Sequence, residues 1–184
     1  MEIRPGMGMC FPEADMEAME AILGRRSIRR YDGRPVAEDQ IEQILRAAMC
    51  APSANNAQPW QFIVITDRRM LDRIPTIHPY SAMLKEAPLA ILICGDTSME
   101  KFPGYWVVDC AAATQNLLVA AHALGLGTVW LGVYPRQQRM DDIAALLDLP
   151  DHIKPLALVA VGHPAERKPA NDRYDTSRVR RNKW

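Results

Sequence analysis

The chain has 184 residues, of which 48% are hydrophobic, and its 22 Lys and Arg residues balance its 22 Asp and Glu residues. These values suit one globular domain with a real core and argue against a general nucleic-acid binder, which needs a strongly basic face. No apolar run approaches the ~20 residues that span a bilayer, and no long apolar signal segment is found, so we expect a cytoplasmic protein that does not enter a membrane.

Cysteine and histidine, which often mark redox and metal sites, show no such pattern here. The four cysteines form no C-x-x-C pair and three lie in apolar segments: Cys10, Cys50, Cys94 and Cys110. We therefore expect buried, reduced thiols, as in cytoplasmic proteins. The four histidines show no metal-ligand spacing: His78, His122, His152 and His163. We expect no metal.

Two helices are predicted in the first fifty residues, after a loose N-terminal extension of residues 1–14. Asp15 is placed to cap the first helix, which Gly24 ends and which carries an apolar side of Met16, Met19, Ile22 and Leu23. The second helix spans residues 36–49 and is amphipathic. Its expected core positions are Ile41, Ile44, Leu45, Ala48 and Met49.

A strongly basic segment connects these helices. Five arginines fall within ten residues: Arg25, Arg26, Arg29, Arg30 and Arg34. One interpretation is a solvated basic turn. The other is an anion site, because guanidinium groups match phosphate oxygens and Ser27 adds a hydroxyl donor. In an anion site, Arg30 is expected to point away if Arg29 points in.

The stretch of residues 51–66 holds the most unusual chemistry of the chain. Pro52 stops the preceding helix, and Pro59 leads into Trp60 and an apolar strand over residues 62–65. Between the prolines, several side chains offer hydrogen bonds without strong acid or base character: Ser53, Asn55, Asn56 and Gln58. This combination suits the binding of a planar heteroaromatic ring. The same residue types are also ordinary in a plain helix-to-strand loop.

Further elements follow in the middle of the chain. We expect a short helix over residues 67–74, capped by Asp67 and stopped by Pro75, and a buried strand over residues 89–94. The loop around His78 and Tyr80, and the polar stretch of residues 96–105, are each a surface connection or part of a ligand site. The helix predicted over residues 106–124 is apolar on nearly all sides, which indicates burial in the core or at a subunit interface. Its polar exceptions are Asp109, Gln115 and Asn116.

The last third of the chain begins with a glycine-rich segment, residues 125–132. Its glycines follow a helix instead of a strand, so we interpret Gly125 as a helix C-cap followed by a short strand, and not as a dinucleotide fingerprint. Pro135 is expected to open another helix, and residues 156–161 to form the last strand. The charged tail of residues 165–184 is disordered or docks through Tyr174, Val179 and Trp184.

The stretch Pro52-Ser53-Ala54-Asn55-Asn56-Ala57-Gln58-Pro59-Trp60 resembles the signature loop of the FMN-dependent nitroreductase family. The basic segment resembles the family's phosphate-binding motif, and residues 130–133 resemble its segment beside the flavin ring. The resemblance implies phosphate ligands at Arg25, Arg26, Ser27 and Arg29. It implies ring contacts from Pro52, Ser53, Ala54, Asn55, Asn56 and Gln58. It further implies backbone near flavin N5 from Trp130, Leu131, Gly132 and Val133.

The tail departs from the family pattern in part. Arg173 matches one of two basic residues that the family places against the cofactor phosphate, but Asn171 stands where a lysine is common. Arg167 or Lys168 is close enough in sequence to compensate. Some family members carry a carboxylate at the position of Gly132, and this chain does not. No catalytic side chain is expected, because the flavin carries the chemistry.

The resemblance implies an α+β fold with a mixed central sheet flanked by helices. We assign the domain to residues 15–164 and expect the tail, residues 165–184, to pack on the domain or on a partner subunit. It implies a homodimer with FMN at the interface, and NAD(P)H reducing nitroaromatic, quinone or related acceptors by a ping-pong mechanism. The alternatives are a specialised member, such as a dehalogenase, a flavin-cleaving enzyme or an enal reductase, or a flavin-binding module without turnover.

Overall fold

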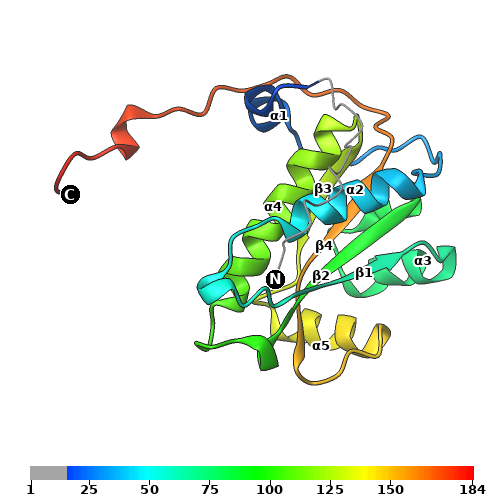
Figure 1. The fold of residues 1–184 in the computed structure, drawn as a ribbon. Helices are drawn as coiled ribbons and strands as arrows, with labels where there is room; N and C mark the ends of the chain where they lie inside the picture. The colour runs from blue at the N-terminus through cyan, green and yellow to red at the C-terminus, as the bar shows by residue number, and fades with distance from the viewer. Residues whose placement is uncertain (1–15) are drawn as a thin grey trace, which may run out of the picture.

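The computed structural model describes residues 16–184, in which helices cover both faces of one sheet (Figure 1). The helices are α1 (Ala18–Gly24), α2 (Glu38–Met49), α3 (Arg68–Ile77), α4 (Trp106–Ala123) and α5 (Gln137–Leu146). The strands are β1 (Trp60–Ile65), β2 (Leu89–Asp96), β3 (Gly127–Gly132) and β4 (Ile153–Gly162). Short 3₁₀ turns are η1 (Ala54–Asn56), η2 (Ala82–Lys85), η3 (Thr97–Met99) and η4 (Thr176–Arg178).

The sheet has the strand order β1-β2-β4-β3, and every neighbouring pair of strands is antiparallel. The expected α+β class is confirmed, but the expectation of a mixed sheet was wrong, because the four described strands pair antiparallel throughout. Parallel pairing among the described residues is limited to one isolated bridge, between Ser27 and Thr128. The central strands β2 and β4 are buried over nearly their whole lengths, so they read as continuous apolar runs, whereas β3 is an edge strand.

The core has two layers because successive side chains of a strand point to opposite faces of the sheet. On one face, Ile91 and Val159 pack with Ile44 of α2 and Leu117 of α4. On the other face, residues of β2 and β4 that alternate with these, including Leu92 and Leu158, pack with α3 and α5. Figure 1 shows α2 and α4 together on the first side and α3 and α5 on the second.

Helix α4 confirms the predicted long apolar helix and its glycine stop. Gly125 has φ +74°, and the N–H of Leu126 donates to the carbonyl of Ala121 at 2.8 Å, which closes the last turn. Asp67 caps α3 as predicted, since its Oδ1 accepts from the N–H of Met70 at 2.9 Å. The predicted end of α3 was wrong: the helix includes Pro75 and runs to Ile77.

Pro75 is tolerated because it removes only its own N–H bond, while the N–H of His78 still donates to the carbonyl of Ile74 at 2.9 Å. The predicted start of α5 at Pro135 was also wrong. Pro135 lies in a turn closed by the N–H of Arg136 and the carbonyl of Val133 at 3.1 Å, and the helix begins at Gln137.

Two expectations of burial were wrong at the end of α2. Met49 and Cys50 are exposed, because they lie beyond Ala48, the last residue of that helix that faces the core. Cys94 and Cys110 are buried as expected, whereas Cys10 lies outside the described residues, as do Asp15 and the extension of residues 1–14. Within residues 16–184, no helix combines the length and apolarity needed to cross a membrane.

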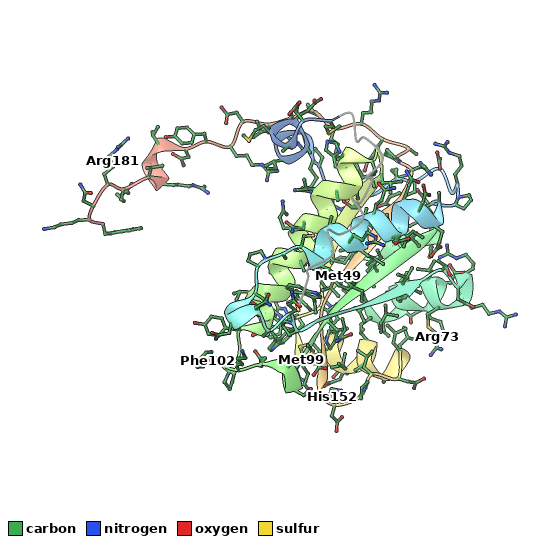
Figure 2. The ribbon with its side chains drawn as sticks, in the orientation of Figure 1. Met49, Arg73, Met99, Phe102, His152 and Arg181 are labelled. Carbon is green, nitrogen blue, oxygen red and sulfur yellow. The ribbon has the colours of Figure 1, made fainter. Side chains whose placement is uncertain are left out.

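The apolar side predicted for the first helix has little cover in the single chain. Met19, Ile22 and Leu23 are each more than half exposed, and Ala21 is the buried residue of α1. The tail beyond residue 170 also leaves the domain. Figure 1 shows it running past α1, and Figure 2 shows Arg181 far from the helices and the sheet. Within the described chain, both surfaces are largely uncovered.

Candidate functional site

The basic segment is attached to the start of β3. The N–H of Ile28 donates to the carbonyl of Thr128 at 2.9 Å, and Ser27 forms the parallel bridge to the same residue. Ile28 is buried against Gly127, where an added Cβ would lie 2.8 Å from the Ile28 side chain. This contact leaves no room for a larger residue at position 127. The segment is therefore a fixed part of the sheet edge and not a freely solvated turn.

Positive charge accumulates where this segment meets the end of α4. Burial lowers the pKa of Arg25, and the neighbouring guanidinium groups of Arg173 and Arg26 lower it further. Burial also lowers the pKa of His122 in α4, helped by Arg25 and Arg26. Like charges held this close favour a bound anion, because each disfavours the charged form of the others.

Arg26 adds a buried donor to the same region. Its Nε donates to the carbonyl of Pro169 at 2.9 Å and its Nη1 to that of Leu23 at 2.8 Å. Its Nη2 is buried without a hydrogen-bond partner among the described residues. Within residues 16–184, no ion pair to an acid is found for Arg25, Arg26 or Arg173. A buried donor group without a hydrogen-bond partner costs about 1–3 kcal/mol of stability, so an anion bound here would stabilise the protein.

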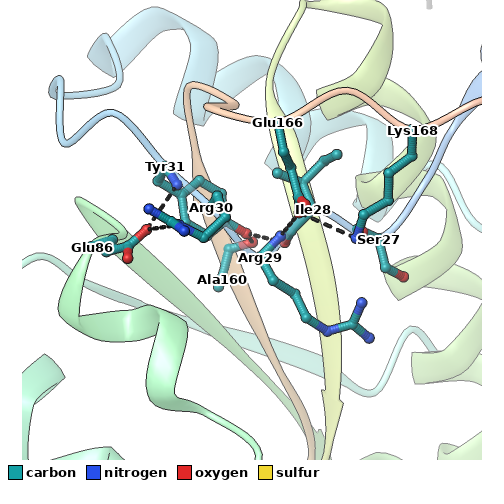
Figure 3. Close-up of polar contacts among 9 residues, drawn as sticks. All are labelled: Ser27, Ile28, Arg29, Arg30, Tyr31, Glu86, Ala160, Glu166 and Lys168. Atoms are coloured by element: carbon teal, nitrogen blue, oxygen red, sulfur yellow. Dashed lines mark hydrogen bonds and ion pairs between the residues drawn. The ribbon is translucent and has the colours of Figure 1, made fainter.

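The first residues of the tail pack on the same segment (Figure 3). Lys168 Nζ donates to the carbonyl of Ser27 at 2.8 Å, and Glu166 Oε1 accepts from the N–H of Arg29. Arg30 forms an ion pair with Glu86 at 3.1 Å, so it points away from this region as expected. The structure thus brings together Arg25, Arg26, Ser27 and Arg173, and beside Ser27 lies Lys168, which also forms an ion pair with Glu166 at 3.2 Å.

The side chain of Arg29 enters a different place from that of Arg25. Figure 3 shows it extending away from Glu166. It lines an open cleft of about 430 Å³ together with the loop that holds His78 and Tyr80 and the end of β3. The cleft-lining residues of β3 are Trp130, Leu131 and Gly132. Arg29 was expected beside the phosphate ligands, and the structure places it at this cleft instead.

His78 forms the inner wall of the cleft. Its side chain is 1% exposed, its Nε2 lies 3.1 Å from the carbonyl oxygen of Gly132, and burial lowers its pKa. Arg139 of α5 donates to the same carbonyl and lies over the ring of Tyr80, 5.9 Å from the ring centre. Val133 is buried and its N–H donates to Leu156, so this N–H is not available to a ligand. This bond removes Val133 from the expected backbone donors.

The amide loop has a strained and defined conformation. Asn55, Asn56 and Gln58 have φ values of 51°, 54° and 51°, which non-glycine residues rarely adopt. The N–H of Gln58 donates to Ser53 Oγ at 3.0 Å, which closes the loop from inside. The N–H of Ala54 donates to Asp109 Oδ1 at 3.0 Å, which ties the loop to α4. Strain of this kind persists where the surroundings hold it and is typical of ligand sites.

The amide loop and the basic segment lie at opposite ends of α4. Asp109 holds the amide loop near the start of α4. Gly24, next to the basic segment, lies against His122 near the end of the same helix, since an added Cβ on Gly24 would lie 2.9 Å from His122. These helix residues are thirteen positions apart, or about 20 Å along the axis. Figure 1 shows α1 at one end of α4 and the cyan turn before β1 at the other. One chain therefore does not bring the loop and the basic segment together.

A comparison with protein-family profiles finds the Nitroreductase family over residues 22–77 and 75–163, which is most of the chain. The chain belongs to the nitroreductase family. A nitroreductase-family protein from Methanothermobacter thermautotrophicus, whose provisional name combines NADH dehydrogenase and NAD(P)H nitroreductase, is 51% identical over 169 residues, 92% of this chain and 88% of its own. An FMN reductase (NAD(P)H) from Bacillus subtilis is 30% identical and covers 89% of this chain and 72% of its own.

A solved structure confirms the nitroreductase fold. The FMN-dependent nitroreductase from Clostridium difficile R20291 has a TM-score of 0.83 to this chain at 29% identity, covering 90% of this chain and 99% of its own. The recognition of the family from three ordered sequence stretches is thereby confirmed. The role of each candidate site residue is a separate question, which rests on the geometry described above.

Sequence reasoning assigned no site role to His122 and left the roles of Asp109 and His78 open. Asp109 stood out as a polar residue in an otherwise apolar helix, a signal that His122 in the same helix shares. His78 was interpreted as part of a surface loop or of a ligand site. Its bond to Gly132, 54 positions away, depends on packing that no local pattern reports.

Proposed function

We propose that this nitroreductase-family chain is an FMN-dependent oxidoreductase that uses NAD(P)H to reduce small electrophilic acceptors such as nitroaromatics and quinones. The observation that carries the proposal is the cluster of Arg25, Arg26 and Arg173, whose guanidinium groups have no acidic partner within residues 16–184. A phosphate monoester supplies both the charge and the acceptors that this cluster needs. The names of the B. subtilis FMN reductase and the C. difficile FMN-dependent nitroreductase support the same cofactor.

The residues present fit FMN in two parts. Arg25, Arg26, Ser27 and Arg173 would hold the phosphate, with Lys168 bonded to the backbone of Ser27 beside them. The cleft lined by Arg29, Trp130 and Gly132 is open to receive the ring. Arg29 there places a positive charge where negative charge on a reduced ring would be stabilised. The donors and acceptors of Ser53, Asn55 and Asn56 suit the polar edge of the same ring.

We further propose that the complete site forms between two copies of the chain. The distance of about 20 Å along α4 keeps the amide loop of one subunit away from its own basic segment. In a symmetric two-fold dimer, the loop of one subunit can meet the basic segment of the other, and this happens twice. The exposed apolar residues of α1 and the extended tail, with Tyr174 and Trp184 exposed, supply surface for such an interface.

When bound, the flavin supplies two-electron transfer between NAD(P)H and an acceptor. The described residues would bind and orient the flavin. The guanidinium cluster would hold its phosphate, the amide loop would pair with the ring edge, and the end of β3 would supply backbone hydrogen-bonding groups. Since donor and acceptor would use the same exposed face of the bound ring in turn, we expect a ping-pong mechanism. Double-reciprocal plots with 1,4-benzoquinone should give parallel lines, whereas intersecting lines would show a ternary complex and a separate acceptor site.

The direct test is the visible spectrum and the turnover of the purified protein. We expect a yellow protein that releases FMN, and not FAD, on denaturation, and that oxidises NAD(P)H steadily when a quinone is present. FMN at 100 times its dissociation constant should add about 2.7 kcal/mol to the free energy of unfolding. A colourless protein that gains no thermal stability from added FMN would refute the proposal. If the protein binds FMN but does not oxidise NAD(P)H steadily, it is a flavin-binding module, and the proposed enzymatic function is refuted.

A further inference from the structure

His122 lies in the last turn of α4, against the end of α1 where the basic segment begins (Figure 1). An added Cβ on Gly24 would lie 2.9 Å from His122 Nε2, so the imidazole occupies the space that this glycine leaves open. Arg25 follows Gly24 directly in the chain. Arg26 folds back on the same helix end, where its Nη1 donates to the carbonyl of Leu23 at 2.8 Å. The imidazole and two guanidinium groups are therefore gathered at one end of α1.

In the protein chain alone, the imidazole of His122 is held neutral by its surroundings. The side chain is half-buried, and this burial lowers its pKa from the usual 6.5, as do the guanidinium groups of Arg25 and Arg26. Glu20 of α1 acts in the opposite direction, and among the described residues no hydrogen bond to the ring contributes. The charge of this ring therefore depends on the net charge of the basic segment beside it.

The other charged residues around α4 do not set the charge of this ring. Asp109 of α4 itself is thirteen positions away, or about 20 Å, and β1 and β3 carry no titratable side chain. Gly95 lies against Trp106 at the start of α4, which places its neighbour Asp96 there, and Lys154 pairs with Gly95. Helix α2 exposes its charged residues to solvent: Glu38, Asp39, Glu42 and Arg46.

A bound phosphate monoester would reverse the balance of charge at His122. Such a group carries a charge of about −1.5 to −2 at pH 7, which offsets the charges of Arg25 and Arg26. A negative charge close to an imidazole favours its protonated form, and the C-terminal end of a helix, where His122 lies, also stabilises a positive charge. The protonated ring has two N–H donors, so it can add a charge-assisted hydrogen bond to a phosphate oxygen.

We propose that His122 is a further member of the phosphate site, and that it takes up one proton from solvent when a phosphate monoester binds beside Arg25 and Arg26. The inference rests on the proposed function, in which FMN supplies that phosphate. Because such a linkage is reciprocal, the proton tightens FMN binding by the same factor by which FMN tightens the binding of the proton. His122 therefore strengthens FMN binding as the pH falls, over a range in which arginine side chains keep their charge.

The test compares FMN binding by the full chain, freed of flavin, in the wild type and in His122→Gln between pH 8 and pH 6. Glutamine keeps a polar side chain that does not titrate. We expect the ratio of the two dissociation constants, variant over wild type, to rise from near unity at pH 8 to about 3- to 10-fold at pH 6, as a pKa change of about one unit on binding would produce. The ratio cancels the titration of the phosphate itself, whose second pKa is about 6.

Two controls isolate the pairing of the imidazole with the phosphate. Riboflavin lacks the phosphate, so the same ratio measured with riboflavin should not change with pH. His152 lies at the exposed turn before β4, and His152→Gln should follow the wild type with FMN (Figure 2). Titration calorimetry at pH 7 in two buffers of different ionisation enthalpy should also show that the wild type takes up more protons per FMN bound than His122→Gln does.

A ratio for FMN that does not change with pH, or equal proton uptake by the two proteins, overturns the inference. The same pH dependence with riboflavin also overturns it, because the proton would then act on the ring or on folding. If His122→Gln does not fold, NMR of the wild-type imidazole with and without FMN measures its pKa, and a pKa that does not rise on binding overturns the inference instead. A wild type that binds no FMN refutes the proposed function before any variant is compared, so the two failures are distinguishable.

Discussion

Asp109 Oδ1 accepts a hydrogen bond of 3.0 Å from the N–H of Ala54, and this bond joins the amide loop to helix α4. The carboxylate is 5% exposed, so the bond is shielded from water. The loop that it holds contains three residues in the left-handed region. Those conformations cost about 1–3 kcal/mol each and need support from outside the loop. Asp109 provides such support from a helix that is otherwise apolar.

Replacing Asp109 with alanine is therefore expected to lower the free energy of unfolding by about 1.5–3 kcal/mol, the worth of a hydrogen bond to a charged group. The substitution should weaken the binding of FMN and of riboflavin by similar factors, because the loop is proposed to contact the ring and not the phosphate. Asp109→Asn keeps an oxygen acceptor and should recover most of the loss. Asn116→Ala is the matched control: it removes a 3.1 Å bond from α4 to Ala47 without touching the loop. Titration calorimetry with both ligands decides the matter, and a loss confined to FMN would contradict this role.

Arg25 is expected to act on the phosphate alone. Arg25→Glu should weaken FMN binding by at least tenfold, since a charge-assisted bond is worth about 1.5–3 kcal/mol, and should leave riboflavin affinity nearly unchanged. Arg30→Glu makes the same change of charge in the same turn, but its side chain pairs with Glu86 and points away, so FMN affinity should persist. Equal losses of FMN and riboflavin in Arg25→Glu would show that Arg25 does not contact the phosphate.

A shared site predicts recovery of binding from two inactive proteins. One carries Arg25→Glu, and the other carries bulky apolar replacements at Ser53 and Asn56. A mixed two-fold dimer has one site with both lesions and one with neither. Random exchange makes about half of the dimers mixed, so roughly a quarter of all sites should bind FMN after co-refolding. No recovery, with mixed dimers demonstrated by native mass spectrometry, would place both elements in one subunit's site.

Stability should fall on mild acidification because two histidines are held neutral. Burial is the main cause that lowers the pKa of both His78 and His122 from the usual 6.5. The unfolded chain then binds protons more readily than the native one, so stability is complete above pH 6.5 and decreases as the pH falls below that value. The carboxyl groups with lowered pKa values, among them Asp32 and Glu166, act only at lower pH. Thermal unfolding between pH 8 and 5 measures the effect, and His78→Gln should flatten the slope. An unchanged slope in that variant would assign the acid sensitivity elsewhere.

Local patterns in the sequence were enough for most elements and for the family. The apolar period of α2, the continuous apolar run of β2 and the glycine after α4 are properties of neighbouring residues, and each predicts its structure directly. The amide loop and the basic segment were predicted as ligand sites from residue types and a resemblance, and this stays a prediction. The ends of helices were less accurate, as Pro75 shows, because one missing N–H does not decide whether the next turn forms.

Only the tertiary structure decided how these segments are arranged in space. The sheet order puts β3 at an edge, and this leaves the Gly132 carbonyl free to meet His78. The packing of α1 and the amide loop at opposite ends of α4 separates the two halves of the proposed site within one chain. Such relations join residues more than fifty positions apart. They follow from which faces of the sheet and helices pack together, and no periodicity within a single segment contains that information.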